Sequence, residues 1–238
     1  MARQRQKNDK NYIIFTDLMT NLMVIFLFIA LSYIMQAVSE NFIKDDIYNT
    51  LNTSLKNDLN DKGVRLSPDL TLRFTPQGNS NLFKNNNPFM TSEFKKQIDE
   101  IWPKYQEVII NQKYIDFIKE IRIEGHADTS HIKECENPGK DNYFCNLGLS
   151  SARSQNVLEY IRSLPCYQNL QDSTKNRIQF LLTANGLSYS KTLNSLGKYT
   201  YTDSDKNIDK DLSRRVEFRI VTSNEKLVQS LKNTNAKR

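Results

Sequence analysis

Between Ile13 and Met35 the sequence is almost entirely apolar, and its central part, Leu18–Met35, carries no charge. A helix that crosses a bilayer needs about 20 mostly apolar residues, because the hydrocarbon core is about 30 Å thick and each residue rises about 1.5 Å. The run is too long for the apolar core of a secretory signal peptide, and Ser32–Gln36 offers no suitable cleavage site. We therefore expect residues 13–36 to form one uncleaved transmembrane helix.

The charges on either side of this run predict its orientation, because basic flanks stay on the cytoplasmic side. Residues 1–12 carry four basic side chains and one acid, whereas residues 37–46 carry three acids and one lysine. We expect a basic cytoplasmic N-terminus and an external remainder. In a Gram-negative cell this describes a single-pass protein of the bacterial inner membrane with a periplasmic C-terminal domain.

One carboxylate, Asp17, lies at the front edge of the apolar run. An ionisable group within a membrane helix costs at least a few kcal/mol and normally faces a protein partner or a water-filled path. At about 100° per residue, Thr20 and Asn21 share a helical face with Asp17. This polar stripe favours a functional role, in which the three side chains line a path for an ion. The alternative is a carboxylate that reaches the lipid headgroups, for which an aspartate side chain is short.

The composition indicates one domain of ordinary size plus a linker. The 238 residues include 33 Lys and Arg and 27 Asp and Glu, for a net charge of +6, without an arginine-rich stretch. We interpret this charge as a solvated surface and expect no nucleic acid among the partners.

Three cysteines follow the apolar run, and an external compartment permits a disulfide between two of them. We expect the bond to join Cys135 to Cys145, because a short loop closes at low entropic cost. A predicted helix separates Cys145 from Cys166 by more than a disulfide can span. A bond between Cys135 and Cys166 is the alternative.

Alternating helix and strand patterns predict the remaining architecture. Residues 37–62 are polar with leucines at every fourth late position, which predicts a helical linker. Strand patterns occur around residues 70–74, 118–123, 179–186 and 214–221, and helices are expected from Thr91 or Ser92, from near Ser150 and from Ser173. We expect an α/β sandwich at residues 63–222, with helices on one mixed sheet, and a polar tail at residues 223–238.

Three motifs occur in order in this outer part: "IEGHADTS", "NLGLSSARSQNVLEYI" and "LSRRVEFRI". Together they resemble the OmpA-like peptidoglycan-binding domain, over about residues 70–221. The resemblance implies non-covalent binding of the wall peptide, chiefly of its diaminopimelate residue. Ala127 and Ser213 replace the threonine and asparagine that are common in the family, so that ligand contacts can differ in detail.

The resemblance also implies site residues whose chemistry fits the ligand. Asp128 is expected to take the ammonium group of diaminopimelate, and Arg153 its carboxylate, with both side chains facing a solvent-filled cleft. Free backbone N–H groups near residues 149–152, at the predicted start of a helix, would assist. Asn146 and Leu149 would shape the pocket, and Arg214 is kept from the last motif. The alternative is an ordinary surface ion pair, and His126 is interpreted as structural, without a metal.

The two halves together resemble MotB-type stator subunits, in which a membrane aspartate carries the driving ion. The match implies that Asp17, with Thr20 and Asn21, serves a proton or sodium path. It implies two copies of this chain inside five copies of a MotA-like or ZorA-like membrane partner. The compact length favours the ZorB branch, which serves Zorya anti-phage defence. A flagellar or gliding motor stator and a passive wall tether stay open.

An enzyme is the least supported class, because the sequence contains no G-x-S-x-G, no H-E-x-x-H and no other catalytic motif. We expect no enzymatic activity, no catalytic residue and no cofactor beyond the transported ion.

Overall fold

The computed structural model describes residues 2–59, 63–78, 80–84, 86–132 and 141–222, with side chains described from Phe15 to Met35 and from Phe42 onward. The chain divides into two compact units, Met1–Phe42 and Ile43–Arg238, and each is described by itself. The helix α1 (Ala2–Ser54) forms the first unit and enters the second. The span Phe15–Met35 within it is long and apolar enough to cross a membrane, with a mean hydropathy of 2.2.

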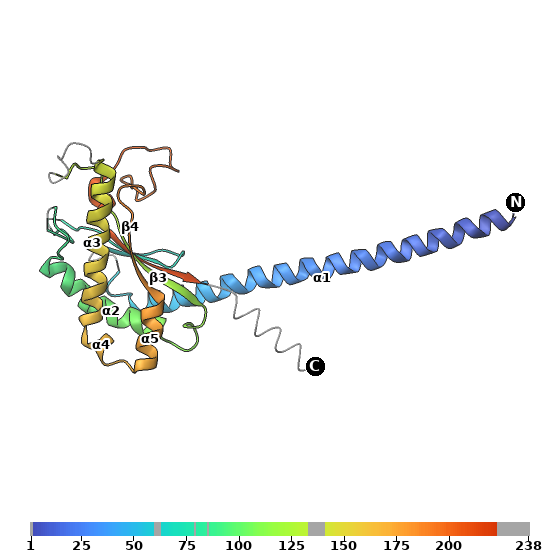
Figure 1. Cartoon of the computed structure of the whole chain (residues 1–238), viewed down its shortest axis with the longest axis horizontal. Coiled ribbons are helices and arrows are strands. Elements are labelled where there is room, and N and C mark those ends of the chain that lie inside the picture. The colour runs from blue at the N-terminus through green and yellow to red at the C-terminus, as the bar shows by residue number, and fades with distance from the viewer. Residues whose placement is uncertain (1, 60–62, 79, 85, 133–140, 223–238) are drawn as a thin grey trace. The chain divides into compact units, whose positions relative to one another are not determined.

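The second unit contains one mixed five-stranded sheet (Figure 1). Its strand order is β1-β2-β5-β3-β4, and only β3 and β4 run parallel. The strands are β1 (Val64–Leu66), β2 (Thr71–Phe74), β3 (Ile118–Gly125), β4 (Leu182–Gly186) and β5 (Val216–Thr222). The helices are α2 (Ser92–Ile109), α3 (Asn142–Ser163), α4 (Pro165–Gln168), α5 (Asp172–Leu181) and α6 (Lys210–Ser213). The predicted α/β sandwich with helices on a mixed sheet is confirmed.

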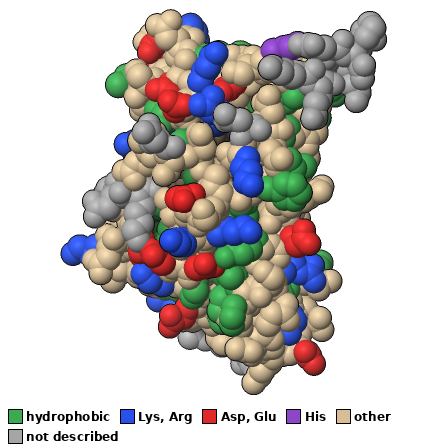
Figure 2. Space-filling view, turned by 90° about the vertical axis from the view of Figure 1, so that its left-hand side faces the viewer, with side chains coloured by type: hydrophobic (Ala, Val, Ile, Leu, Met, Phe, Trp, Pro, Cys, Tyr) green, Lys and Arg blue, Asp and Glu red, His purple; other side chains and the backbone are tan. Residues whose placement is uncertain are grey.

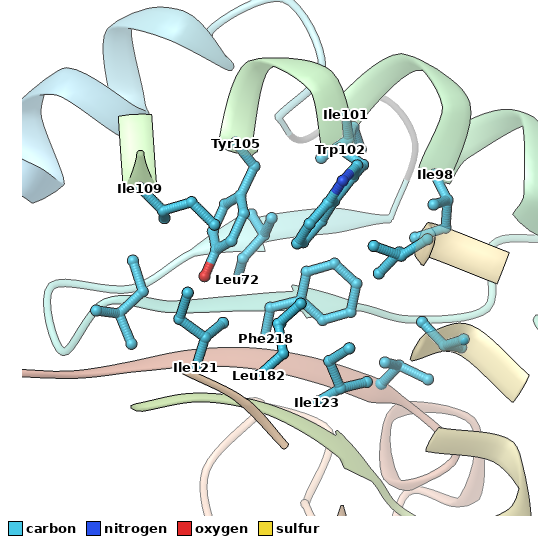
Figure 3. Packing of buried hydrophobic residues seen from close by; sticks show 14 of the residues in the cluster. Leu72, Ile98, Ile101, Trp102, Tyr105, Ile109, Ile121, Ile123, Leu182 and Phe218 are labelled. Atoms are coloured by element: carbon cyan, nitrogen blue, oxygen red, sulfur yellow. The ribbon is translucent and has the colours of Figure 1, made fainter. Parts of the chain in front are cut away.

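The hydrophobic core lies between the helices and one face of the sheet (Figure 3). Strand alternation directs Ile121, Ile123 and Phe218 toward the helices, whereas charged side chains between them point to the opposite face. Trp102 and Tyr105 of α2 pack edge-on against Phe218, with ring centroids 5.9 Å apart in both pairs. The fully buried aromatic residues of α2 thus fix that helix on the centre of the sheet.

The segment predicted as a helical linker is part of this core. Ile47, Leu51 and Leu55 recur every fourth residue, and all three are fully buried among the core residues. The predicted linker at 37–62 is helical through Ser54, but the compact unit begins at Ile43 rather than at the predicted boundary of 63. The hydrophobic spacing is that of a packed helix face, and a solvated linker would not need it.

The helix expected near Ser150 begins two turns earlier. Asp141 caps α3, and its carboxylate accepts a hydrogen bond from the backbone N–H of Tyr143 at 3.0 Å. Residues 149–152 therefore lie inside the helix, and their N–H groups are not the free groups of a first turn. The expectation that these groups bind an anion is wrong.

Charged side chains on the face shown in Figure 2 include both signs, interspersed with apolar residues. Among the side chains described there, neither sign forms one broad area. This distribution agrees with the interpretation of the net charge as a solvated surface.

Candidate functional site

One pocket gathers all five side chains that were predicted to bind peptidoglycan: Asp128, Asn146, Leu149, Arg153 and Arg214. Its wall combines the turn after β3, the first turns of α3, the start of the segment after α6, and part of the segment between β2 and α2. Residues from four separate stretches of sequence therefore meet at one point.

Two glycines let α3 approach the sheet beside this pocket. A Cβ atom on Gly125 would lie 2.3 Å from the carbonyl oxygen of Ser150, and one on Gly186 would lie 2.1 Å from the hydroxyl oxygen of Ser151. Any larger residue would push the helix outward. The contact holds α3 at the C-terminal ends of β3 and β4, so that Arg153 comes within electrostatic reach of Asp128.

The carboxylate of Asp128 is buried and already has partners on both oxygens. Only 3% of the residue is exposed. One oxygen accepts a hydrogen bond from the backbone N–H of Ser130 at 2.5 Å, and the other accepts one from the Arg214 guanidinium at 2.7 Å. The expectation of a solvent-facing carboxylate is wrong, because Arg214 covers it.

Arg153 is held by two contacts that leave its terminal nitrogens available. Its Nε–H donates to the carbonyl oxygen of Asn87 at 3.2 Å, and its guanidinium lies 4.9 Å from the ring centroid of Phe83. The residue is 8% exposed, so it too is buried rather than solvent-facing. Burial, with the nearby charge of Arg214, lowers the pKa of Arg153 to about 10, which leaves it cationic at neutral pH. The two terminal nitrogens form the fork that suits a carboxylate.

Asn146 ties the turn after β3 to α3. Its side-chain amide donates to the carbonyl oxygen of Ser130 at 3.2 Å and to that of Asn142 at 3.1 Å. Asn146 therefore holds the backbone turn that presents Asp128 against the start of α3. Leu149 is half-buried and supplies an apolar part of the wall.

Sequence reasoning missed one wall of the pocket. Residues Asn81, Leu82, Phe83 and Asn86 line it from the segment before α2, in which the sequence predicted no site residue. Asn86 has a φ of 49°, in the left-handed region that asparagine tolerates better than most residues. The run of asparagines and the isolated Phe83 were the available signals, but neither indicates which site a loop will reach.

A buried charge cluster lies beneath the pocket. The carboxylate of Glu217, fully buried, accepts hydrogen bonds from Arg215 at 2.7 Å and from Arg73 at 2.8 Å. His126 lies 3.5 Å from Glu217 and 3.7 Å from Glu124, between their carboxylates. Burial raises the pKa of Glu217, but His126 and the two guanidinium groups outweigh it and hold the pKa well below its usual range.

The same cluster is the set of described residues best arranged for a metal ion. Glu124, His126 and Glu217 each offer one ligand atom, all within 4.8 Å of one another. However, the guanidinium groups of Arg73, Arg215 and Arg219 surround these carboxylates and supply positive charge already. The cluster therefore fits a structural ion network better than a divalent cation, and His126 is buried as its structural interpretation requires.

Asp17, Thr20 and Asn21 all lie exposed within the candidate span of α1. The hydroxyl of Thr20 donates to the carbonyl oxygen of Thr16 at 2.7 Å. The helix keeps the three polar residues on one side, in agreement with the predicted stripe.

The predicted disulfide involves Cys135, which lies outside the described residues. Cys166, the thiol that this pairing leaves over, is free and half-buried. Its pKa is raised, chiefly by burial.

The α/β fold and its helix long enough to cross a membrane resemble those of MotB-type proteins, and the predicted resemblance to MotB-type stator subunits is confirmed. The chain is 27% identical over 239 residues to the Zorya protein ZorB of Escherichia coli, covering 96% of this chain and 94% of that protein. It shares its fold with a solved putative MotB-like protein from Desulfovibrio vulgaris, at a TM-score of 0.51 and 21% identity over 79% of this chain and 99% of that one. No family model matches.

Proposed function

We propose that this chain is a stator-type subunit of the bacterial inner membrane that holds peptidoglycan through the Asp128–Arg153 pocket. The observation that carries the proposal is the preformed fork of Arg153 beside the carboxylate of Asp128. Diaminopimelate presents an ammonium and a carboxylate on one carbon, and this pair matches both charges. Asn146, Leu149 and Arg214 complete the pocket.

The membrane part of the proposal concerns ion flow. The basic N-terminus is cytoplasmic, the chain crosses the membrane once, and the compact domain lies in the periplasm. Asp17, with Thr20 and Asn21, carries a proton, or alternatively a sodium ion, as it faces a ring of five ZorA-like or MotA-like subunits around two copies of this chain. A carboxylate in a single span needs such neighbours, because lipid alone cannot solvate it. The chain itself is not an enzyme.

The likeness to ZorB along nearly the whole chain supports a role in anti-phage defence. A flagellar or gliding motor stator is the alternative. A passive wall tether would use the pocket but has no use for Asp17.

The binding half of the proposal is tested with the compact unit that begins at Ile43. Purified sacculi are incubated with the parent domain, with Arg153→Ala and with Asp128→Ala, and the bound fraction is measured after checking each fold by circular dichroism. We expect both folded variants to lose binding. Equal retention by all three would refute the wall-binding role.

The assembly is tested by the mass of the complex purified with its membrane partner. We expect five partners to two copies of this chain. A one-to-one ratio, or a stable isolated monomer in the membrane, would contradict the proposed arrangement.

A further inference from the structure

Arg214 occupies the position that an ammonium group would need beside Asp128. One terminal nitrogen of its guanidinium donates to the Asp128 carboxylate at 2.7 Å. The other terminal nitrogen contacts the carboxylate of Asp211, on the solvent side. The Asp128 side chain is 3% exposed, whereas those of Arg214 and Asp211 are 38% and 72% exposed. A ligand that approaches from solvent therefore meets Arg214 before it meets Asp128.

The carboxylates of Asp128 and Asp211 offer this guanidinium two ion-pair partners, one inside the pocket and one at its solvent-exposed edge. If the Arg214 side chain leaves Asp128, it keeps the charge of Asp211 beside it, in contact with water. Arg153 favours such a departure, because the two guanidinium groups repel each other, as the lowered pKa of Arg153 reflects. Displacement of Arg214 thus costs less than the loss of an isolated buried ion pair.

The backbone around Arg214 is held by hydrogen bonds, whereas its side chain is partly exposed. The carbonyl oxygen of the next residue, Arg215, accepts a hydrogen bond from the backbone N–H of His126 at 3.0 Å, and the fully buried Arg215 side chain is bonded to Glu217 at 2.7 Å. The backbone N–H of Arg214 donates to the carbonyl oxygen of Lys210 at 3.0 Å. Exchange of the cation beside Asp128 therefore requires a side-chain rotation and no change in the fold.

We infer that Arg214 is a specificity-determining residue that competes with the ligand's ammonium group for Asp128. This inference rests on the proposed wall-peptide function. When a ligand with a free ammonium binds, its ammonium replaces the Arg214 guanidinium beside Asp128. The binding free energy therefore gains only the difference between these two ion pairs. A ligand without the amine leaves the Arg214–Asp128 pair intact and gains from Arg153 alone. Arg214 therefore sets how strongly the pocket distinguishes a free amine from a blocked one.

The opposite role for Arg214 is direct contact with a ligand carboxylate, which the second guanidinium of the pocket also permits. The two roles predict opposite effects on removal of the Arg214 charge. Competition predicts tighter binding of the amine-bearing ligand, whereas direct contact predicts weaker binding of every carboxylate-bearing ligand.

The test uses the full chain in detergent and two probes: a purified muropeptide that ends in diaminopimelate, and the same muropeptide with its free amine acetylated. Titration calorimetry compares the parent with Arg214→Gln. We expect the variant to bind the free-amine probe about fivefold more tightly, which corresponds to about 1 kcal/mol at ~1.4 kcal/mol per tenfold. The acetylated probe should bind both proteins equally.

Two further variants make the result specific. Lys210→Gln removes one positive charge from an exposed side chain of α6, the short helix that ends just before Arg214, and should leave both affinities as in the parent. In an Asp128→Asn background, Arg214→Gln should no longer strengthen binding of the free-amine probe, because nothing remains to compete for. Thermal unfolding of each variant confirms that it is folded.

The outcomes separate the two proposals. Weaker binding of both probes by Arg214→Gln, or unchanged binding of the free-amine probe, overturns the competition while the wall-binding function stands. Failure of the parent to bind either probe overturns the proposed function itself, and the competition with it.

Discussion

The guanidinium of Arg153 lies over the ring of Phe83, with its central carbon 4.9 Å from the ring centroid, although the two residues are 70 positions apart in the sequence. Phe83 belongs to the segment before α2 and Arg153 to α3. The ring therefore connects the wall of the pocket that sequence reasoning missed with the cation that it predicted. Phe83 also packs edge-on against Phe94, with centroids 5.5 Å apart, so its position is set by the core.

Replacement of Phe83 by leucine should weaken binding of sacculi without unfolding the domain. Leucine keeps most of the buried apolar volume but removes the aromatic face on which Arg153 rests. A desolvated cation–π contact contributes about 1–2 kcal/mol, so we expect affinity to fall roughly five- to thirtyfold. Phe89→Leu is the matched control, because Phe89 lies in the same segment and is 60% exposed. Equal affinity of the two variants would show that Phe83 does not position Arg153.

Arg153→Lys should fail to restore the binding that Arg153→Ala loses. A lysine keeps the charge but has no planar fork to meet a carboxylate and no Nε–H for Asn87. We expect both variants to lose about 2–3 kcal/mol of binding free energy, or roughly a hundredfold in affinity. Titration of the purified muropeptide measures this loss. If the lysine variant bound as tightly as the parent, the pocket would recognise the ligand carboxylate by charge alone and not through the guanidinium geometry.

Asp17→Asn should abolish protection against phage while the protein still accumulates in the membrane with its partner. The substitution keeps the size and polarity of the side chain but removes the group that binds and releases a cation. Cells that carry the complete defence gene set are challenged with phage, and plaque formation is counted. Asp45→Asn, an exposed carboxylate of α1 beyond the span, is the control and should protect like the parent. Full protection by the Asp17 variant would remove the ion path from the proposal.

Glu217→Gln should destabilise the domain at neutral pH and lose this effect in acid. Because the pKa of Glu217 is depressed in the folded state, its charge stabilises the fold above the unfolded value near 4.5. That contribution falls as the pH drops below 4.5 toward the folded pKa. Breaking a buried ion pair costs about 3–5 kcal/mol, so Tm at pH 7 should fall by roughly 6–20 °C.

Thermal unfolding at pH 7, 5 and 3.5 checks this prediction, with Glu107→Gln as the control at an exposed carboxylate. The difference in Tm between the Glu217 variant and the parent should be largest at pH 7 and smallest at pH 3.5. A difference that stays constant with pH would assign the loss to packing rather than to charge.

Leu51→Ala should destabilise the compact unit by about 2–5 kcal/mol, because Leu51 is fully buried. Urea unfolding of the domain that begins at Ile43 measures the change in the free energy of unfolding. Leu196→Ala, at a leucine that is 67% exposed, should change it by less than about 0.5 kcal/mol. A domain shortened to start at Gly63 should unfold without a cooperative transition, and cooperative unfolding of that fragment would contradict the assignment of this helix to the core.

Local patterns predicted most strands, because alternation of side chains such as Ile121, Ile123 and Phe218 is visible in the sequence. The five motif residues of the site were predicted through resemblance, and all five line the pocket. The predictions that failed concern contacts between segments that are distant in the sequence. The pairing of Asp128 with Arg214 joins positions 86 apart, and no local pattern indicates that a predicted ammonium site already contains a cation.

The prediction of where α3 begins was wrong for a different reason. The buried face of the first turns of this helix consists of the polar residues Asn146, Ser150, Arg153 and Ser154, so that a hydrophobic helical periodicity becomes visible only later, at Val157 and Ile161. The cap at Asp141 is a better marker of the first turn, since a side chain that accepts the N–H of Tyr143 stabilises the start without any buried residue.

Three buried side chains, those of Ile47 and Leu51 in α1 and of Leu55 directly after it, also have a mechanical meaning. A flexible linker resists pulling only through the entropy of its chain, and it lengthens under small forces. A helical segment whose side chains interlock with the strands of a core cannot lengthen until that core is broken. Force applied to the segment is therefore borne by the same packing that holds the sheet and its pocket together. Strain at one end of the domain is transmitted stiffly instead of being absorbed as slack.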